Sequence, residues 1–363
     1  MLIIELDDKK ENEMKNIFRK WFYKEHKLKD FSKVVKEDKE LKNIIFNETI
    51  QEELKLKKKT VDYYCKMIEK INIDSTQKDE IEECKNILED FFFSKFSYDI
   101  KSQKYTSKYV KETSKLLSEE AIKYFYKNYR DFRRDEGANM VKALDIGVCP
   151  YCNRNYIDIY SKNKKLYFKG ELDHYYPKSK YPHLALSLFN MIPVCKTCNH
   201  EKNDINNKQG LYPYRNKGED YCNFELSWLT ENDKYDITYQ NEILKEKQYD
   251  FTYLMGISDN FKIELKSKDI EHKEIISYTE ELFNLNKKYN NINSKAYVKN
   301  LLRKRYIFNE SYLESISETF ELPKEAKQVL FSIDLEKPNF NERPFSKLTY
   351  DILKELEYNN EED

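Results

Sequence analysis

Glycine and proline are scarce in this sequence of 363 residues, which contains 6 glycines and 8 prolines. That scarcity excludes collagen-like, linker-rich and disordered chains. Long apolar runs are also missing, because the longest, 184–194, is interrupted by Ser187 and Asn190 and is too short to span a bilayer. The first ten residues lack the apolar core of a signal peptide. We therefore expect a cytoplasmic protein without a membrane segment.

The chain also lacks an overall charge excess. Its 64 Lys and Arg residues balance 65 Asp and Glu residues, so the formal net charge of −1 does not by itself indicate a polyanionic partner. The segment 149–209 differs, because it contains ten basic and five acidic residues, a local net charge of +5. A basic segment inside a neutral protein is typical of a nucleic-acid site, although composition alone is weak support for one.

Aromatic residues, by contrast, are abundant: the sequence contains 30 tyrosines and 21 phenylalanines, most of which we expect to fill the core. The spacing predicts a helix over 118–134 that interleaves aromatic and basic residues, with Gly137 as its C-terminal cap. Such a helix could follow a nucleic-acid backbone. It also fits an amphipathic helix that buries one aromatic face, which is the interpretation we favour.

Periodicity divides the chain into three regions. Residues 1–140 have apolar residues at helical spacing, for example over 41–70, whereas residues 141–215 concentrate Pro, Gly, Cys and His. Residues 216–363 have a mixed pattern. The elements expected there are strands at 235–239 and 261–265 and helices at 270–320 and 346–357. We therefore predict an α+β fold with a mainly helical N-terminal region, a small metal-bound centre and a mixed α/β C-terminal region.

Four of the seven cysteines form two C-x-x-C pairs, Cys149 with Cys152 and Cys195 with Cys198, and 42 residues separate the pairs. Two such turns can complete the tetrahedral Cys₄ shell of a structural Zn²⁺. A thioredoxin-type redox motif is the alternative, and two copies flanking a basic segment argue against it. An odd number of cysteines fits a reducing cytoplasm better than a disulfide framework.

Three short motifs lie between the pairs and at the second pair. Residues 170–179 read GELDHYYPKS, residues 189–194 read FNMIPV, and residues 195–202 read CKTCNHEK. In this order the motifs resemble the HNH (ββα-metal) endonuclease family, specifically its zinc-containing Cys₄ members, over about 60 of the 363 residues. The resemblance implies a small ββα core that hydrolyses phosphodiester bonds in nucleic acid, with DNA as the expected substrate.

Phosphodiester hydrolysis needs an activated water, a cation beside the phosphate and support for the leaving oxygen. A neutral imidazole titrates near working pH, so His174 can act as the general base. The resemblance implies that Asp173 and Asn199 hold a catalytic Mg²⁺ or Mn²⁺ ion. It also implies that Asn190 bonds the backbone near His174 and orients the imidazole. Because Cys198 precedes Asn199, the zinc would fix the helix that carries this ligand.

The resemblance leaves some positions open. We expect the nucleic acid to contact three lysines: Lys178, Lys180 and Lys202. His200 could replace Asn199 as a ligand, although we favour a solvent-facing position for it. Asn203 departs from the pattern, because many family members have Gly there, which leaves the path of the helix end undecided.

The same motifs look like the nuclease components of bacterial anti-phage systems, such as Septu-type and retron-associated effectors. Those nucleases work beside a separate ATPase, and this chain has no G-x-x-x-x-G-K run of its own. We therefore expect an ATPase subunit or another defence component as a partner. Two other functions stay open: a non-catalytic zinc-ribbon module that binds nucleic acid or protein, and an RNA-cleaving toxin.

Overall fold

The computed structural model describes residues 4, 6–57, 60–71, 77–99, 101–102, 104–203, 210–214, 220–228, 251–309, 311–313, 315 and 326–358. These residues belong to two compact units. The first unit comprises Ile3–Tyr151 and Asn155–Glu219, and the second comprises Cys152–Arg154 and Asp220–Asp363. Each described sheet consists of two antiparallel strands among many helices, so the fold is mixed α+β, as predicted.

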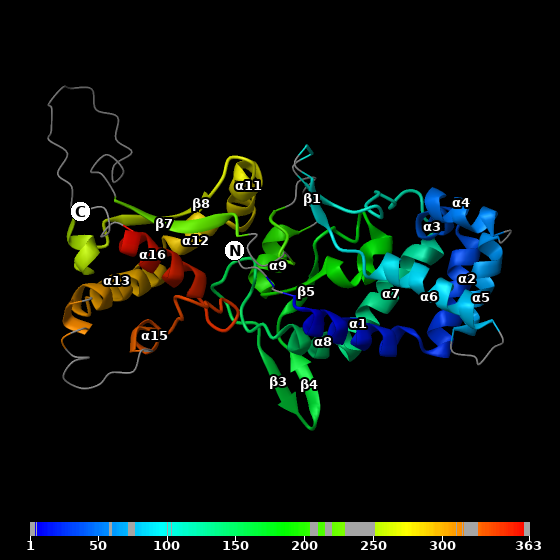
Figure 1. The fold of residues 1–363 in the computed structure, drawn as a ribbon, viewed down its shortest axis with the longest axis horizontal. Coiled ribbons are helices and arrows are strands. Elements are labelled where there is room, and N and C mark those ends of the chain that lie inside the picture. The colour runs from blue at the N-terminus through cyan, green and yellow to red at the C-terminus, as the bar shows by residue number, and fades with distance from the viewer. Residues whose placement is uncertain are drawn as a thin grey trace. The chain divides into compact units, whose positions relative to one another are not determined.

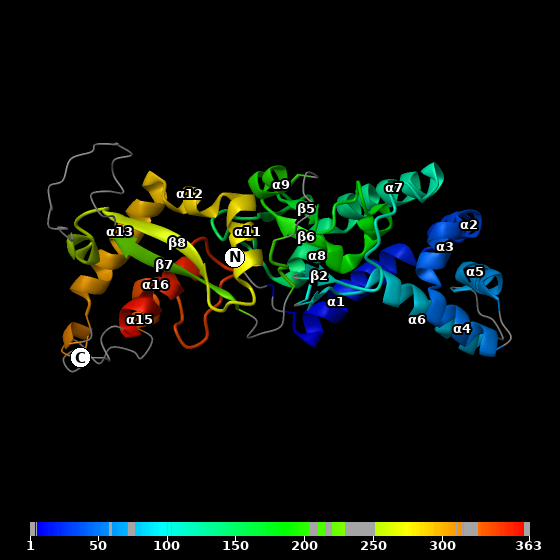
Figure 2. The same ribbon diagram turned by 90° about the horizontal axis from the view of Figure 1, so that it is seen from above.

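The first unit begins with a group of helices. These are α1 (Asp8–Phe22), α2 (Glu25–Glu37), α3 (Lys39–Ile45), α4 (Glu48–Leu56), α5 (Val61–Lys70) and α6 (Lys78–Phe92). Figures 1 and 2 show α2 to α6 gathered at one end of the unit, away from β5. The predicted helical stretch 41–70 is divided because the side chains of Asn47 and Thr60 accept hydrogen bonds from backbone N–H groups and begin new helices there.

An aromatic cluster fills the core of these helices. The rings of Phe18, Trp21 and Phe132 lie in mutual contact, with centroids 5.1–6.0 Å apart, and all three are buried. Phe22 and Phe92 extend the cluster, with centroids 4.7 Å apart. The abundance of aromatic residues therefore serves the core, as the composition predicted, and rings of this size bury a large apolar area each.

Two helices connect this core to the strands. The Ser118 side chain accepts a hydrogen bond from Ala121 N and begins α7 (Glu119–Asp135). Helix α7 buries Tyr124, Phe125, Tyr129 and Phe132 on one face, which confirms that it packs as an amphipathic helix. The expectation that Gly137 caps it is wrong. Glu136 ends α7 by donating to the carbonyls of the last turn without needing positive φ, and Gly137 begins α8 (Gly137–Leu144).

The strands of the first unit are short and pair locally. They are β1 (Ser97–Asp99) with β2 (Lys104–Thr106), β3 (Ile159–Lys162) with β4 (Lys165–Phe168), and β5 (Glu171–His174) with β6 (Met191–Val194). Two 3₁₀ turns, η1 (Pro182–Leu186) and η2 (Leu188–Asn190), precede β6, and α9 (Lys196–Lys202) follows it. Gly170 links β4 to β5 in a space that excludes a side chain. An added Cβ would lie 2.3 Å from the Phe168 ring and 2.7 Å from the Val194 carbonyl oxygen.

The second unit combines one hairpin with helices. Its elements are β7 (Cys222–Trp228), η3 (Phe251–Met255), β8 (Phe261–Ser267), α11 (Lys273–Phe283), α12 (Leu285–Tyr289), α13 (Ile292–Ile307), α15 (Ala326–Phe331) and α16 (Ser346–Tyr358). Strand β8 confirms the prediction at 261–265, and α16 confirms the final helix. The predicted strand at 235–239 lies outside the described residues. Every helix among the described residues is too short or too polar to cross a bilayer.

Candidate active site and zinc site

A strand–strand–helix segment carries most of the predicted site. Strand β5 pairs antiparallel with β6, so that Asp173 faces Ile192 and His174 faces Met191 across the ladder. Helix α9 begins directly after Cys195, which is its N-cap residue. Residues 171–174 and 191–202 thereby form two antiparallel strands followed by a short helix, which brings the end of β5 and the face of α9 together.

The four predicted zinc ligands form one buried cluster. The sulfur atoms of Cys149, Cys152, Cys195 and Cys198 all lie within 4.8 Å of one another. Tetrahedral zinc with bonds of about 2.3 Å places its sulfur ligands about 3.8 Å apart, so the cluster needs little contraction to bind the ion. Cys195 Sγ accepts a hydrogen bond from Asn155 Nδ2 at 3.3 Å, and Cys152 Sγ accepts one from Arg154 N at 3.5 Å.

These N–H donors favour the thiolate form that zinc requires, because an ionised sulfur accepts a hydrogen bond more strongly than a thiol does. The structure therefore shows a Cys₄ cluster that could hold a structural zinc ion. Tyr151, which lies between the two cysteines of the first pair, contacts Asp173 of β5.

His174 is buried, with 6% of its surface exposed, and its Nε2 lies 3.0 Å from the carbonyl oxygen of Ala185. A carbonyl can only accept, so Nε2 carries the hydrogen, and the lone pair of the neutral ring is on Nδ1. Burial, with smaller contributions from the nearby charges of Lys178 and Lys202, lowers the pKa of His174 to about 3. The Tyr129 ring packs against the imidazole, with centroids 4.2 Å apart.

Asn190 holds the segment that supplies this carbonyl. Its Oδ1 accepts a hydrogen bond from Tyr176 N at 2.7 Å, while its Nδ2 donates to the carbonyls of Tyr176 and Leu184 at 3.1 and 2.9 Å. Asn190 is fully buried and uses both ends of its amide in these contacts. It therefore ties the chain that follows His174 to the turn that contains Ala185, and so fixes both ends of the imidazole hydrogen bond.

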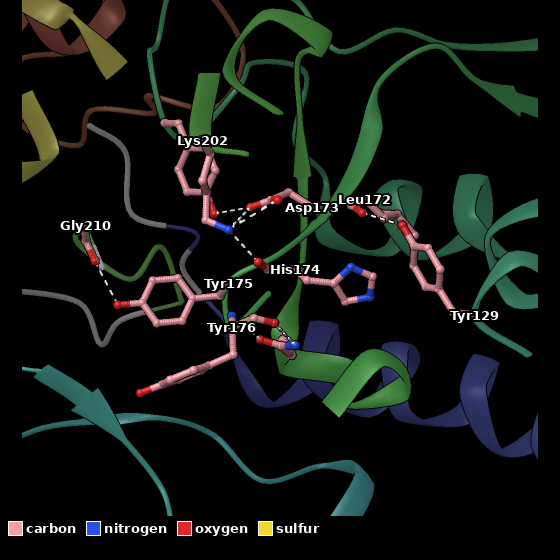
Figure 3. Close-up of polar contacts among 10 residues, drawn as sticks. Tyr129, Leu172, Asp173, His174, Tyr175, Tyr176, Lys202 and Gly210 are labelled. Atoms are coloured by element: carbon pink, nitrogen blue, oxygen red, sulfur yellow. Dashed lines mark hydrogen bonds and ion pairs between the residues drawn. The ribbon is translucent and has the colours of Figure 1, made fainter. Parts of the chain in front are cut away.

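Asp173 is bound on two sides. The Tyr151 hydroxyl donates to Asp173 Oδ2 at 2.8 Å, and the Lys202 ammonium lies 3.0 Å from the same oxygen. Figure 3 shows Lys202 extending to both the Asp173 carboxylate and the His174 carbonyl. Burial, followed by the charge and hydrogen bond of Asp173, raises the pKa of Tyr151 well above its usual value, so its hydroxyl stays a donor.

A cavity of about 790 Å³ opens beside these residues, within the size range of ligand sites. Residues of α7, β4, β5 and α9 line it, and they include Asp173, His174 and Asn199. Its basic lining residues are Arg130, Arg133, Arg134, Lys165, Lys178 and Lys202. Its acidic ones are Glu171 and Asp173, which leaves a net charge of +4 among the lining residues.

The sequence indicated that the basic residues of 118–134 could follow a nucleic-acid backbone, but it did not assign them, or Tyr151, to the site. Arg130, Arg133 and Arg134 lie on the face of α7 opposite its buried aromatic residues, so the helix both packs in the core and lines the cavity. The R-x-x-R-R spacing was the available signal, because positions three and four apart share one helix face. The contact of Tyr151 with Asp173 had no signal, since it joins residues 22 apart through tertiary packing.

Other predicted residues lie elsewhere. Lys180 is not among the described residues that line the cavity, and its backbone carbonyl accepts hydrogen bonds from Thr113 N and Ser114 N. His200 is exposed on α9, in agreement with the solvent-facing position. Asn203 ends α9 with φ +32° and ψ 176°, outside the left-handed region that Asn tolerates, so this backbone conformation favours Gly.

Comparison of the chain with protein-family models, with curated proteins and with solved structures finds no match. The function must therefore be argued from the site itself.

Proposed function

We propose that the chain is a metal-dependent endonuclease of the HNH type, with DNA as its expected substrate and His174 as its general base. The observation that carries this proposal is the fixed tautomer of His174. The Ala185 carbonyl accepts the hydrogen bond from Nε2, which leaves Nδ1 as the proton acceptor of a residue that lines a cavity together with a carboxylate and a side-chain amide.

The charge of the cavity supports nucleic acid as the substrate. A phosphodiester carries one negative charge per linkage, and a lining with six cationic side chains against two acidic ones attracts such a polymer. A bound phosphate also opposes the effect of Lys178 and Lys202 on the imidazole, since a negative neighbour stabilises the protonated form. The substrate therefore makes His174 a better proton acceptor than it is in the empty cavity.

The oxygen donors of the cavity suit a hard divalent ion, Mg²⁺ or Mn²⁺. The Asp173 carboxylate and the Asn199 side chain line the same cavity, and such oxygens are the ligands these ions prefer. The Lys202 ammonium pairs with Asp173, so a divalent ion on that carboxylate would displace this lysine toward the phosphate. When bound, the ion supplies a Lewis acid for the phosphate and a charge that stabilises the leaving oxygen. Lys178 and Lys202 line the cavity, and we propose that they hold the phosphate.

The order of the motifs supports a role in bacterial anti-phage defence. The segment 149–202 resembles nuclease components of bacterial anti-phage systems, and we propose that this chain is an effector of that kind, controlled by a separate ATPase or another defence component. The strand–strand–helix segment and the adjacent Cys₄ cluster support the assignment to the zinc-containing HNH type.

The proposal is tested by cleavage assays on plasmid, single-stranded DNA and tRNA with Mg²⁺, Mn²⁺ or EDTA, after zinc has been measured in the purified chain. His174→Ala and Asp173→Ala should each lower the cleavage rate at least about 100-fold in proteins that stay folded and retain zinc. The matched control is His26→Ala, on the exposed face of α2, which should cleave at the wild-type rate.

Cleavage that persists in EDTA, or that is indifferent to His174, would overturn the mechanism. Nucleic-acid binding without cleavage under any metal condition, unchanged in both variants, would instead support the zinc-ribbon module. Cleavage restricted to tRNA would support the RNA-cleaving toxin.

A further inference from the structure

The β3–β4 hairpin has the chemistry of a binding surface. Tyr160 and Tyr167 face each other across its two strands and stack with centroids 5.4 Å apart and an angle of 17° between their planes. Both rings remain exposed, at 42% and 39%. Lys169 lies over the Tyr160 ring at 5.3 Å and Lys165 over the Tyr167 ring at 5.9 Å. One face of the hairpin thus presents two aromatic rings framed by ammonium groups.

The tip of the hairpin adds a second, independent feature. Asn163 and Lys164 form its two-residue turn, with φ values of +51° and +62°. Turns of this type favour Asn first and Gly second, because both positions have positive φ. A lysine in place of that Gly is strained, and strain that persists on a solvent-exposed tip points to a function for the side chain. Figure 1 shows this tip projecting away from the helices of the first unit.

The aromatic surface is continuous with the cavity. Lys165 and Tyr167 belong to the hairpin and also line the cavity that contains His174. On the opposite face Leu166 and Phe168 are half-buried, the Phe168 ring covers Gly170, and both strands contact α8. The hairpin is therefore held in place by its inner face, and its outer face leads from the solvent to the basic lining of the cavity.

We propose that the outer face of the β3–β4 hairpin binds unpaired nucleotides of the substrate strand, whose bases stack on Tyr160 and Tyr167 while Lys164 and Lys165 hold the phosphates. The inference rests on the proposed nuclease function, and it names the class of substrate. Exposed rings can stack only on bases whose faces are accessible, and a duplex hides those faces in its own stack. The α7 arginines continue the phosphate path within the cavity.

The test is equilibrium binding of the full-length His174→Ala protein, measured by fluorescence anisotropy. The probes are a labelled DNA strand, an RNA strand of the same sequence and the corresponding DNA duplex. The double variant Tyr160→Thr with Tyr167→Thr keeps residues that favour strands. It should bind the single strands at least about tenfold more weakly, because each stacked base is lost, and it should bind the duplex within about twofold of the parent.

Tyr306→Thr is the matched control, because Tyr306 is also exposed, at 54%, and lies on α13 of the second unit. It should leave binding of all three probes unchanged. A second variant, Lys164→Gly, relieves the strained turn and so keeps the hairpin folded. It should weaken binding of both single strands and reduce the slope of log K against log salt by about 0.7.

Equal binding by the parent and the double variant overturns the inference, and so does an equal loss on the single strands and the duplex. Tyrosine-dependent binding of either strand supports it, and comparison of the DNA and RNA probes identifies the preferred sugar. The two proposals fail separately. A wild-type chain that binds single strands through the tyrosines but does not cleave them refutes the nuclease, whereas cleavage with hairpin-independent binding refutes only the inference.

Discussion

Replacement of Tyr151 by Phe tests whether the zinc segment positions the Asp173 carboxylate. The Tyr151 hydroxyl donates to Asp173 Oδ2 at 2.8 Å, and its ring is 1% exposed between two cysteines of the cluster. Phe fills the same volume, so the substitution removes one hydrogen bond without creating a cavity. We expect the proposed catalytic ion to bind more weakly, because the carboxylate loses the group that fixes its orientation.

The magnitude follows from the partners that remain. A hydrogen bond to a charged group contributes about 1.5–3 kcal/mol, and Lys202 still binds both oxygens of Asp173 after the substitution. We therefore expect the lower end of that range, about 1.5 kcal/mol. That free energy corresponds to roughly a tenfold higher concentration of Mg²⁺ for half-maximal cleavage. Loss of a group that hydrogen-bonds to a metal ligand lowers metal affinity by a similar factor. The rate at saturating Mg²⁺ should change much less.

The assay is a titration of cleavage rate with Mg²⁺, and the control is Tyr175→Phe. Tyr175 is also buried and donates its hydroxyl to a carbonyl, that of Gly210 at 2.8 Å, without contact to the carboxylate (Figure 3). Tyr151→Phe should shift the midpoint while Tyr175→Phe leaves it in place, and both proteins should retain zinc. Equal midpoints for Tyr151→Phe and wild type, or equal shifts in both variants, would refute the positioning role.

Three further predictions concern stability. His183 is buried between a Thr113 hydroxyl and the Tyr109 carbonyl, and burial lowers its pKa to about 4 from 6.5. The unfolded chain therefore binds a proton that the folded chain does not as the pH falls from 6.5 to 4, and the free energy of unfolding should fall by up to about 3 kcal/mol. Denaturant titrations across this range should show a smaller fall for His183→Gln; identical pH slopes would contradict the assignment. Cys198→Ala should lose zinc and melt at a lower temperature, whereas Cys65→Ala, outside the cluster, should keep its zinc; zinc retained in both would argue against a Cys₄ site. Gly170→Ala should lower the free energy of unfolding by about 1–3 kcal/mol through overlap with the neighbouring ring, and Gly137→Ala, whose nearest neighbour is 3.5 Å away, should not; equal effects would remove the steric explanation.

Local spacing determined what could be predicted from the sequence. A C-x-x-C turn brings two sulfurs close together within four residues of backbone. Each cysteine pair of the cluster could therefore be predicted without knowledge of the fold. The aromatic face of α7 could also be predicted, because helical periodicity within one element indicates its buried positions. The α+β class followed from alternation between helical and strand patterns, as β8 and α16 illustrate.

Contacts between elements could not be predicted in this way. Periodicity indicates which face of α7 is buried, but not that its exposed arginines border the cavity at the end of β5. The same holds for Tyr151, because a residue inside a C-x-x-C pair can point toward any neighbour until the strands are paired. Asn203 is a position where the resemblance alone suggested Gly, and the structure has Asn there at positive φ.

The anchors of the site matter because its scaffold is weak. A sheet of two short strands is marginal by itself, so β5 cannot hold Asp173 and His174 in position through its ladder alone. Each residue has an anchor from another segment: Tyr151 binds the Asp173 carboxylate, and Asn190 fixes the turn whose carbonyl binds His174. These anchors are polar contacts that bury little apolar surface, but they determine the orientation of the two groups that the proposed chemistry uses. Substitutions at the anchors should therefore cost more free energy in cleavage than in unfolding. Substitutions in the aromatic core should cost more free energy in unfolding than in cleavage.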